Sequence, residues 1–176
     1  MTTAHLRLVP HEPSDLRALI RGPGWYAQSF GVPAAVGLRE FLVSKDVSAE
    51  FLAWLARSDK ADAWTHGFAL VHPEDGFVVG TASFKGAPDA QGAVEIAYGV
   101  VPGYQGRGLA TEAAGALVDF AWRSGQVRLV LAHTLPVANA SGRVLTKCGF
   151  RKVGEVTDPE DGVVWRWEHS TPNTAH

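Results

Sequence analysis

Residues 100–122, VVPGYQGRGLATEAAGALVDFAW, place a glycine-rich segment directly before a long helical pattern. Its glycines are Gly103, Gly106 and Gly108. Apolar residues then share one face at helical spacing, which predicts an amphipathic helix over 108–124 that ends at Gly125. A helix N-terminus presents unpaired N–H groups and the positive end of its dipole, and glycines let backbone N–H groups approach an anion. The stretch therefore predicts a phosphate-binding loop.

The rest of the chain predicts an α+β fold around this loop. We expect strands at 6–10, 66–73, 77–86, 93–101 and 127–134, and a closing hairpin of 150–156 and 163–169. We expect helices at 12–20 with Ser14 as cap, 48–59 with Ser48 as cap, 108–124 and 138–149. Residues 21–37, rich in glycine and proline, are expected to form a loop. Together these elements predict a mixed, mostly antiparallel sheet of about seven strands flanked by helices, in a single domain of residues 1–176.

Composition limits the partners. The formal net charge of −2 gives no basic footprint for nucleic acid, and no apolar run approaches the roughly 18 residues of a membrane helix. The start of the chain has no apolar signal core, and the single cysteine fits a reducing compartment. The histidines show no metal-binding spacing. We therefore expect a cytoplasmic protein, monomer or homodimer, that binds a small ligand without metal, membrane or nucleic acid.

Two common phosphate-binding motifs fail on this loop. A Walker A loop needs Lys and Ser or Thr where the chain has Leu109 and Ala110. A dinucleotide fingerprint needs a third glycine where the chain has Thr111, and a carboxylate after the next strand, which instead ends in His133 and Thr134. A tight turn without ligand is the remaining alternative, and three glycines at one helix start argue against it.

A third pattern fits the same residues. QGRGLA at 105–110 resembles the Q/R-x-x-G-x-G/A signature of the GCN5-related N-acetyltransferases, the GNAT superfamily. AHTLPVANASGRVLTKCGF at 132–150 is similar to the second coenzyme segment of that superfamily, closest to the branch of ribosomal-protein N-terminal acetyltransferases. The resemblance is strong over 93–150. It implies transfer of an acetyl group from acetyl-coenzyme A to a primary amine, on a small molecule or a protein N-terminus, by direct attack in a ternary complex.

The resemblance also implies which residues bind the coenzyme. The pyrophosphate would lie on Gln105, Gly106, Arg107, Gly108, Leu109, Ala110 and Thr111. The pantetheine arm would pair with the strand from Tyr98 to Val101, where the N–H of Val100 or Val101 would stabilise the oxyanion. A solvent-exposed charge without a phosphate contact is an equal alternative for Arg107. The family asparagine three residues before Ser141 is Ala138, so either Asn139 takes over this coenzyme contact or the contact is lost.

Two residues are candidates for the proton transfers. Glu95 is the candidate base, because strand alternation puts its carboxylate on the face opposite Ile96 and Tyr98. A structural ion pair is its alternative role. Ser141 is the candidate acid or thiol-orienting group, with helix capping as its alternative. His133, at a strand end, is either a base or a structural histidine.

The acceptor is expected to contact residues outside these motifs. Trp25 and Tyr26, in the 21–37 segment, are candidates for stacking on the acceptor, and packing into the core is the alternative for both. Two other functions remain open: a coenzyme A-binding module with weak or no catalysis, and a nucleotide-binding domain without acyl transfer.

Overall fold

The computed structural model describes residues 1–42 and 49–170 of the chain. Seven strands form one sheet in the order β1-β2-β3-β4-β5-β7-β6. The strands are β1 (Arg7–Pro10), β2 (Phe68–His72), β3 (Phe77–Phe84), β4 (Ala93–Val100), β5 (Leu129–Thr134), β6 (Arg151–Asp158) and β7 (Gly162–Ser170). Every neighbouring pair is antiparallel except β4 and β5, which run parallel. The predicted mixed, mostly antiparallel sheet of an α+β fold is confirmed.

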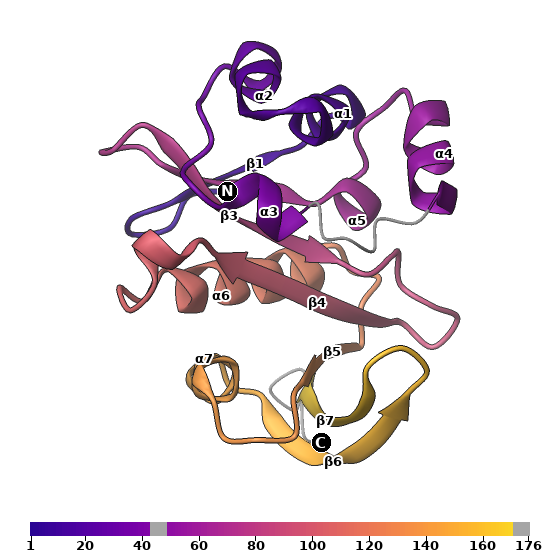
Figure 1. Ribbon diagram of the computed structural model, residues 1–176. Coiled ribbons are helices and arrows are strands. Elements are labelled where there is room, and N and C mark those ends of the chain that lie inside the picture. Colours follow the sequence, from indigo (N-terminus) through magenta and orange to yellow (C-terminus); the bar gives the residue numbers. More distant parts are fainter. Residues whose placement is uncertain (43–48, 171–176) are drawn as a thin grey trace.

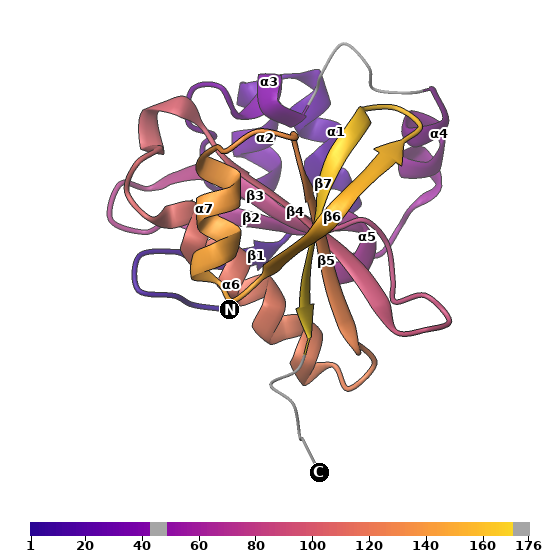
Figure 2. The ribbon, with the colours of Figure 1, turned by 90° about the horizontal axis from the view of Figure 1, so that it is seen from below.

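Helices cover both faces of this sheet. The N-terminal helices are α1 (Pro13–Arg21), α2 (Pro23–Phe30), α3 (Leu38–Leu42), α4 (Ala49–Arg57) and α5 (Ala63–His66). The later ones are the 3-10 turn η1 (Pro102–Tyr104), α6 (Leu109–Arg123) and α7 (Ala140–Lys147). Helices α1 to α5 gather on one face, and α6 and α7 lie on the other (Figures 1 and 2).

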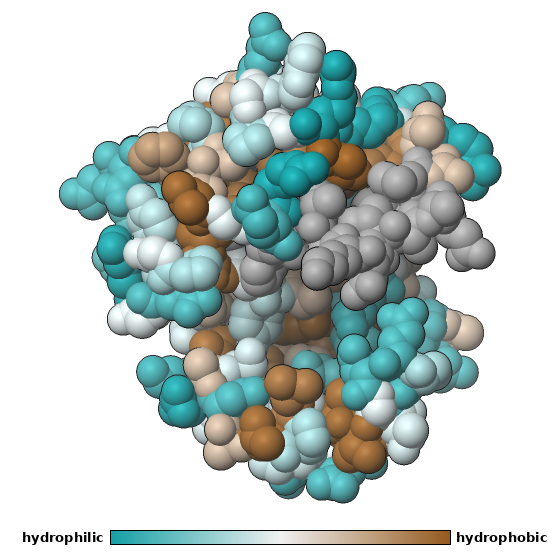
Figure 3. Space-filling view, viewed as in Figure 1, coloured by the Kyte–Doolittle hydropathy of each residue, from teal (hydrophilic) through white to brown (hydrophobic). Residues whose placement is uncertain are grey.

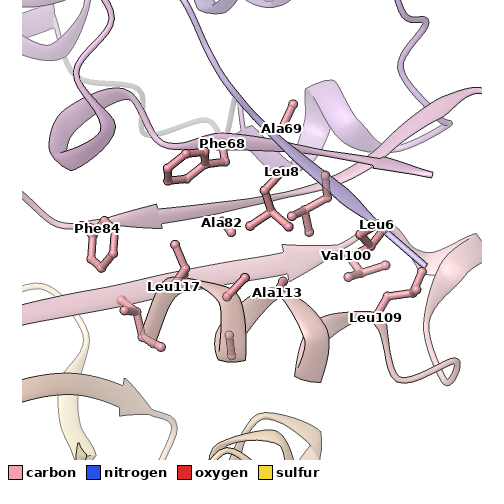
Figure 4. Close-up of a cluster of buried hydrophobic side chains, with 14 of the residues drawn as sticks. Leu6, Leu8, Phe68, Ala69, Ala82, Phe84, Val100, Leu109, Ala113 and Leu117 are labelled. Carbon is pink, nitrogen blue, oxygen red and sulfur yellow. The ribbon is translucent and has the colours of Figure 1, made fainter. Parts of the chain in front are cut away.

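Helix α6 is anchored by its apolar stripe. Leu109, Ala113 and Leu117 are at most 3% exposed and point toward the sheet, where Ala82, Phe84 and Val100 meet them (Figure 4). These side chains recur at every fourth position, so they share the face of the helix that turns to the sheet. The packing fixes the N-terminus of α6 beside the end of β4, and this juxtaposition creates the candidate site.

The local signals around α6 predicted its boundaries within one residue. The helix ends one residue before Ser124, and Gly125 follows with φ 73°, the left-handed conformation that a C′ glycine supplies. The predicted cap at Ser14 is wrong: α1 begins at Pro13, and the Glu12 N–H donates to the Asp15 carboxylate at 2.9 Å. The predicted cap at Ser48 lies outside the described residues.

The prediction of a loop over residues 21–37 is wrong for residue 21 and for 23–30, which are helical, whereas 31–37 lie outside any helix or named strand. Pro23 is the first residue of α2, where its missing N–H leaves no hydrogen bond unmade, and Gly31 ends the helix with φ 84°. The glycines and prolines of this segment thus mark the boundaries of a helix. The short helices α3 and α5 were not expected from the sequence either, because five and four residues carry too little periodicity to be recognised.

Candidate active site

The parallel strands β4 and β5 pair only at their beginnings. Ala93, Val94 and Glu95 lie opposite Leu129, Val130 and Leu131. Beyond Glu95 the two strands separate, although β4 continues to Val100 and β5 to Thr134. The molecule is hollowed between the part that carries α7, β6 and β7 and the rest (Figure 3). The separation leaves one edge of β4 free over its second half.

Hydrogen-bond alternation identifies the backbone groups on this free edge. The Val101 N–H donates to the Val79 carbonyl at 2.9 Å, and the Lys85 N–H donates to the Glu95 carbonyl at 2.8 Å. Odd-numbered residues of this strand therefore point their backbone groups at β3, and even-numbered ones point them into the opening. The N–H groups of Tyr98 and Val100 face the opening. Val101 is excluded as an oxyanion donor because its N–H is already bound.

The glycine-rich loop joins this strand end to α6. Gly106 and Gly108 have φ values of 77° and 78°, a conformation that residues with a side chain rarely adopt. Gly108 is the N-cap of α6 and has no side chain with which to cap it, so the first N–H groups of the helix remain available to a ligand. Within residues 1–42 and 49–170, and apart from the adjacent backbone, no atom lies within 4 Å of a Cβ built on either glycine, so the loop is open on this side. The cradle fits a diphosphate.

A cleft of about 470 Å³ connects the loop with the free strand edge. Most of the predicted coenzyme residues line it: Tyr98, Val100, Gln105, Gly106, Gly108, Leu109, Ala110 and Thr111. The candidate acid Ser141 lines it too, as do Arg143, Val144 and Lys147. The sequence favours a surface ion pair for Arg143 and Lys147, with contact to a nucleotide phosphate as the alternative. Ala140, Val144 and Lys147 recur at helical spacing, and this pattern could have predicted that the three residues share the side of α7 that faces the cleft.

Arg107 and Tyr104 contact each other and stabilise the loop. The Arg107 guanidinium stacks over the Tyr104 ring at 4.8 Å and donates to the Gly103 carbonyl at 3.3 Å. The Tyr104 hydroxyl donates to the Asp75 carboxylate at 2.8 Å, which ties the loop to the turn between β2 and β3. Arg107 is not among the residues that line the cleft, so the geometry favours a structural role over the predicted phosphate contact.

Asn139 caps α7 instead of lining the cleft. Its side-chain oxygen accepts the Gly142 N–H at 2.9 Å, and the residue borders a separate apolar hollow that contains Trp165 and Trp167. The geometry thus gives no support to a coenzyme contact by Asn139. It also removes capping as the alternative role of Ser141, which lies exposed on the cleft wall.

The Tyr98 hydroxyl stands beside Ser141 in this wall. It donates a long hydrogen bond of 3.4 Å to the Ser141 carbonyl. Burial raises the pKa of the Tyr98 phenol, and the charge of Cys148 raises it further. The phenol therefore stays protonated at neutral pH and can donate a hydrogen bond into the cleft.

Charged side chains meet on the opposite face of the sheet. Glu95 Oε1 lies 2.7 Å from His133 Nδ1 and 3.0 Å from Lys85 Nζ, and the Glu95 side chain is 22% exposed. The ion pair that sequence reasoning kept as an alternative for Glu95 is present. His133 joins it from β5, across the point where the two strands separate.

Neither aromatic residue predicted for the acceptor reaches this place. Tyr26 is completely buried and its hydroxyl lies 2.7 Å from Nε2 of His11, so the prediction of an accessible ring is wrong. Trp25 is 49% exposed, but it lies in a groove formed only by α1 and α2, with the Arg21 guanidinium 3.8 Å from its ring. For both residues the contacts are those of packing within the first two helices.

A larger hollow, of about 900 Å³, lies on the far side of α6. It is bordered by residues 1–3, α6, Cys148 and His169 and contains no residue of the 105–110 loop, so its volume does not make it the candidate site. Among residues 1–42 and 49–170, no group of three or more His, Cys, Asp or Glu side chains could hold a metal ion. No helix in the same ranges combines the length and apolar character needed to cross a membrane.

The fold and the cleft define a protein with an opening between two separating strands, next to a glycine-rich loop at a helix N-terminus. A family model described as "Acetyltransferase (GNAT) domain" matches residues 5–151, which include the loop, both strands and α7. The protein belongs to the GNAT acetyltransferase family.

Individual relatives place it near ribosomal-protein acetyltransferases. The [ribosomal protein uS5]-alanine N-acetyltransferase of Escherichia coli K12 is 28% identical over 92 residues, 52% of this chain and 47% of that protein. The chain thus matches about half the length of its curated relatives. The S5-alanine acetyltransferase of Vibrio fischeri shares the fold at 16% identity, with a TM-score of 0.66 over 98% of this chain and 97% of that one. RimL, a ribosomal L7/L12 alpha-N-protein acetyltransferase solved in complex with coenzyme A, has a TM-score of 0.64 at 16% identity, covering 97% and 96% of the two chains.

Proposed function

We propose that this protein transfers the acetyl group of acetyl-coenzyme A to a primary amine by direct attack in a ternary complex. The observation that carries the proposal is the shared cleft between the free edge of β4 and the glycine-rich loop at the start of α6. Bound there, acetyl-coenzyme A supplies an activated acyl group. Family membership and the coenzyme A complex of a similar fold support the same donor.

The loop is proposed to hold the pyrophosphate. The N–H groups of Gly106, Gly108 and the first turn of α6 converge on open space, and the helix dipole favours negative charge there. Arg143 and Lys147 add positive charge from the α7 side of the cleft. The loop thus binds the pyrophosphate end of acetyl-coenzyme A and leaves the edge of β4 for the pantetheine end.

The free edge of β4 is proposed to hold the pantetheine arm. The backbone N–H and carbonyl of Tyr98 point into the opening, where they pair with the amides of the arm as an added strand would. The Val100 N–H then polarises the acyl carbonyl and stabilises negative charge that develops on its oxygen. Val101 has no part in this step, since its N–H is bound to Val79.

Side chains on the two faces of the sheet divide the proton transfers. Ser141 and Tyr98 lie on the cleft side, where their hydroxyl groups orient and stabilise the departing thiolate by hydrogen bonding. Glu95 lies on the other face, within the charged group that Lys85 and His133 complete. We assign the removal of a proton from the ammonium group of the acceptor to this charged group.

The acceptor is proposed to be a protein N-terminus or a small amine. Similarity to the uS5-alanine acetyltransferase supports the first. The charged side chains near Glu95 include both signs, so the charge around the proposed base does not single out a polycation as the acceptor.

The experiment that tests the function combines two measurements. Coenzyme A affinity is measured by calorimetry, and thiol release from acetyl-coenzyme A is followed with an alanine-initiated peptide, a polyamine and an aminoglycoside. We expect binding together with amine-dependent thiol release. Tight binding without turnover on the whole panel would indicate a coenzyme A-binding module. Thermal stabilisation by ATP or NAD but not by coenzyme A would overturn the assignment of the donor.

A further inference from the structure

We propose that Nε2 of His133 is the atom that takes the proton from the acceptor amine, and that Glu95 is the positioning carboxylate that orients the imidazole. The inference rests on the proposed function, and it gives different roles to Glu95 and His133, both of which the sequence left open as bases. Four observations support it: the tautomer of His133, the contacts of Glu95, the position of the pair in the sheet, and the charges around it.

The contact with Glu95 selects the tautomer of His133. Nδ1 lies 2.7 Å from Glu95 Oε1, and an ionised carboxylate can only accept a hydrogen bond, so Nδ1 carries the proton. A neutral imidazole then has its basic lone pair on Nε2. No described residue makes a hydrogen bond to Nε2, and the side chain of His133 is 21% exposed. His133 therefore presents a free basic nitrogen that an amine can reach.

The Glu95 oxygen, in contrast, is already engaged. Oε1 accepts from Nδ1 of His133 at 2.7 Å and lies 3.0 Å from Nζ of Lys85. Both contacts are charge-assisted or become so when the imidazole is protonated. Protonation of this oxygen by the substrate would break contacts to β3 and to β5. Holding an imidazole in place requires neither contact to break, so positioning suits Glu95 better than proton transfer.

The pair stands where the strands separate. Leu131 is the last residue of β5 in register with β4, opposite Glu95, and His133 follows two positions later on the same face. His133 would lie level with Ala97 if the strands stayed together. Ala97 immediately precedes Tyr98, whose backbone opens into the cleft. The imidazole is thus placed at the vertex of the opening, on the face away from α6 and α7.

Charged groups from all neighbouring strands surround the imidazole. Arg166 of β7 lies opposite His133 in the register, and its charge is paired with Glu168 at 3.0 Å. Asp158 at the end of β6 accepts backbone N–H groups of Asp161 and Glu160, which hold the pKa of its carboxyl below the ordinary value, and Lys85 and His133 add smaller charge effects. Glu95 is the carboxylate in direct contact, so it stabilises the imidazolium that the reaction forms.

The proposed step transfers one acetyl group and removes two protons from the acceptor nitrogen. One proton passes from the ammonium nitrogen to Nε2, and the freed nitrogen lone pair forms the new C–N bond to the acyl carbon. The C–S bond breaks, and its electron pair leaves on sulfur as a thiolate. A second proton leaves the nitrogen as the amide forms. Of the two released protons, one goes to the thiolate and the other goes to the solvent. The imidazolium returns its proton to water, which the partial exposure of His133 permits.

The test compares His133→Gln, Glu95→Gln and a control, His5→Gln. His5 forms a similar contact, with Nδ1 2.9 Å from Glu112 Oε2, but this contact lies at the start of α6, away from the point where β4 and β5 separate. We expect His133→Gln to lower kcat about 100-fold and to remove the acid limb of the pH–rate profile, with coenzyme A affinity unchanged. Glu95→Gln should lower kcat about tenfold and retain the acid limb, because the imidazole is still present but is no longer held in place by a carboxylate. His5→Gln should change neither.

Nitrogen NMR of the unmodified protein supplies a readout that does not depend on turnover. We expect the proton of neutral His133 on Nδ1. A proton on Nε2 would overturn the proposal, as would an acid limb that survives in His133→Gln and disappears in Glu95→Gln. If no amine in the panel is acetylated, the proposed function is contradicted instead. The NMR result would still show whether Nδ1 of His133 carries the proton, as the proposed pair with Glu95 requires.

Discussion

The side-chain amide of Gln105 donates a hydrogen bond to the carbonyl oxygen of Val100 at 3.0 Å. The bond joins the first residue of the glycine-rich loop to the last residue of β4, and both residues line the cleft. It occupies a carbonyl group that would otherwise have no partner on the free strand edge. One side chain thus couples the two surfaces that are proposed to hold the coenzyme.

Gln105→Ala is expected to weaken coenzyme A binding about tenfold. Loss of the bond frees the strand end, and a net hydrogen bond of about 1.4 kcal/mol corresponds to that factor in Kd. Calorimetry with coenzyme A measures the change. Gln91→Ala, in the exposed turn before β4, is the matched control and should bind normally. An unchanged Kd in Gln105→Ala would show that the bond does not organise the cleft.

Gly108→Asp is expected to abolish coenzyme A binding. The substitution puts a negative charge at the proposed phosphate site and a side chain on a residue with φ 78°. Gly103→Asp adds the same charge in the preceding turn, where φ is not left-handed and the residue does not line the cleft. We expect less than a tenfold loss in that control. Equal losses in the two variants would indicate a general charge effect and contradict the placement of the phosphate.

Local patterns explain why the strand segments, α6 and the loop could be predicted from the sequence. Glycine spacing, apolar periodicity and turn residues act over a few positions, so they are readable without the fold. The pairing of Glu95 with His133 joins residues 38 apart and depends on the register of β4 against β5. The exclusion of Val101 depends in the same way on its pairing with Val79 across β3. Neither fact is present in either segment alone.

The N-terminal helices show a second limit. Tyr26 was a candidate for the acceptor because aromatic residues in loops often line clefts, but its segment folds as α2 and buries the ring against His11 and Phe30. Sequence proximity of glycine, proline and aromatic residues does not distinguish a binding loop from a helix boundary. That distinction requires the tertiary partner.

Asn139→Ala is expected to lower the free energy of unfolding by about 1 kcal/mol and to leave coenzyme A affinity unchanged. The Asn139 side chain accepts the Gly142 N–H as the cap of α7, and the residue lies outside the cleft. Ser141→Ala should leave the free energy of unfolding unchanged and should slow turnover. Urea unfolding and calorimetry separate the two effects. Weaker coenzyme binding by Asn139→Ala would restore this asparagine to the coenzyme site.

His11→Gln is expected to reduce the loss of stability in acid. Burial lowers the pKa of His11 to about 4 in the folded protein, although the charge of Asp15 opposes the shift, whereas an unfolded histidine titrates near 6.5. Because the unfolded chain binds the proton more readily between these values, stability falls as the pH drops from about 6.5 toward 4. At pH 5 this linkage amounts to about 2 kcal/mol relative to pH 7.5. Urea unfolding at both pH values should therefore show a decrease that is about 2 kcal/mol smaller in His11→Gln than in the unmodified protein, and equal decreases would assign the acid sensitivity to other groups.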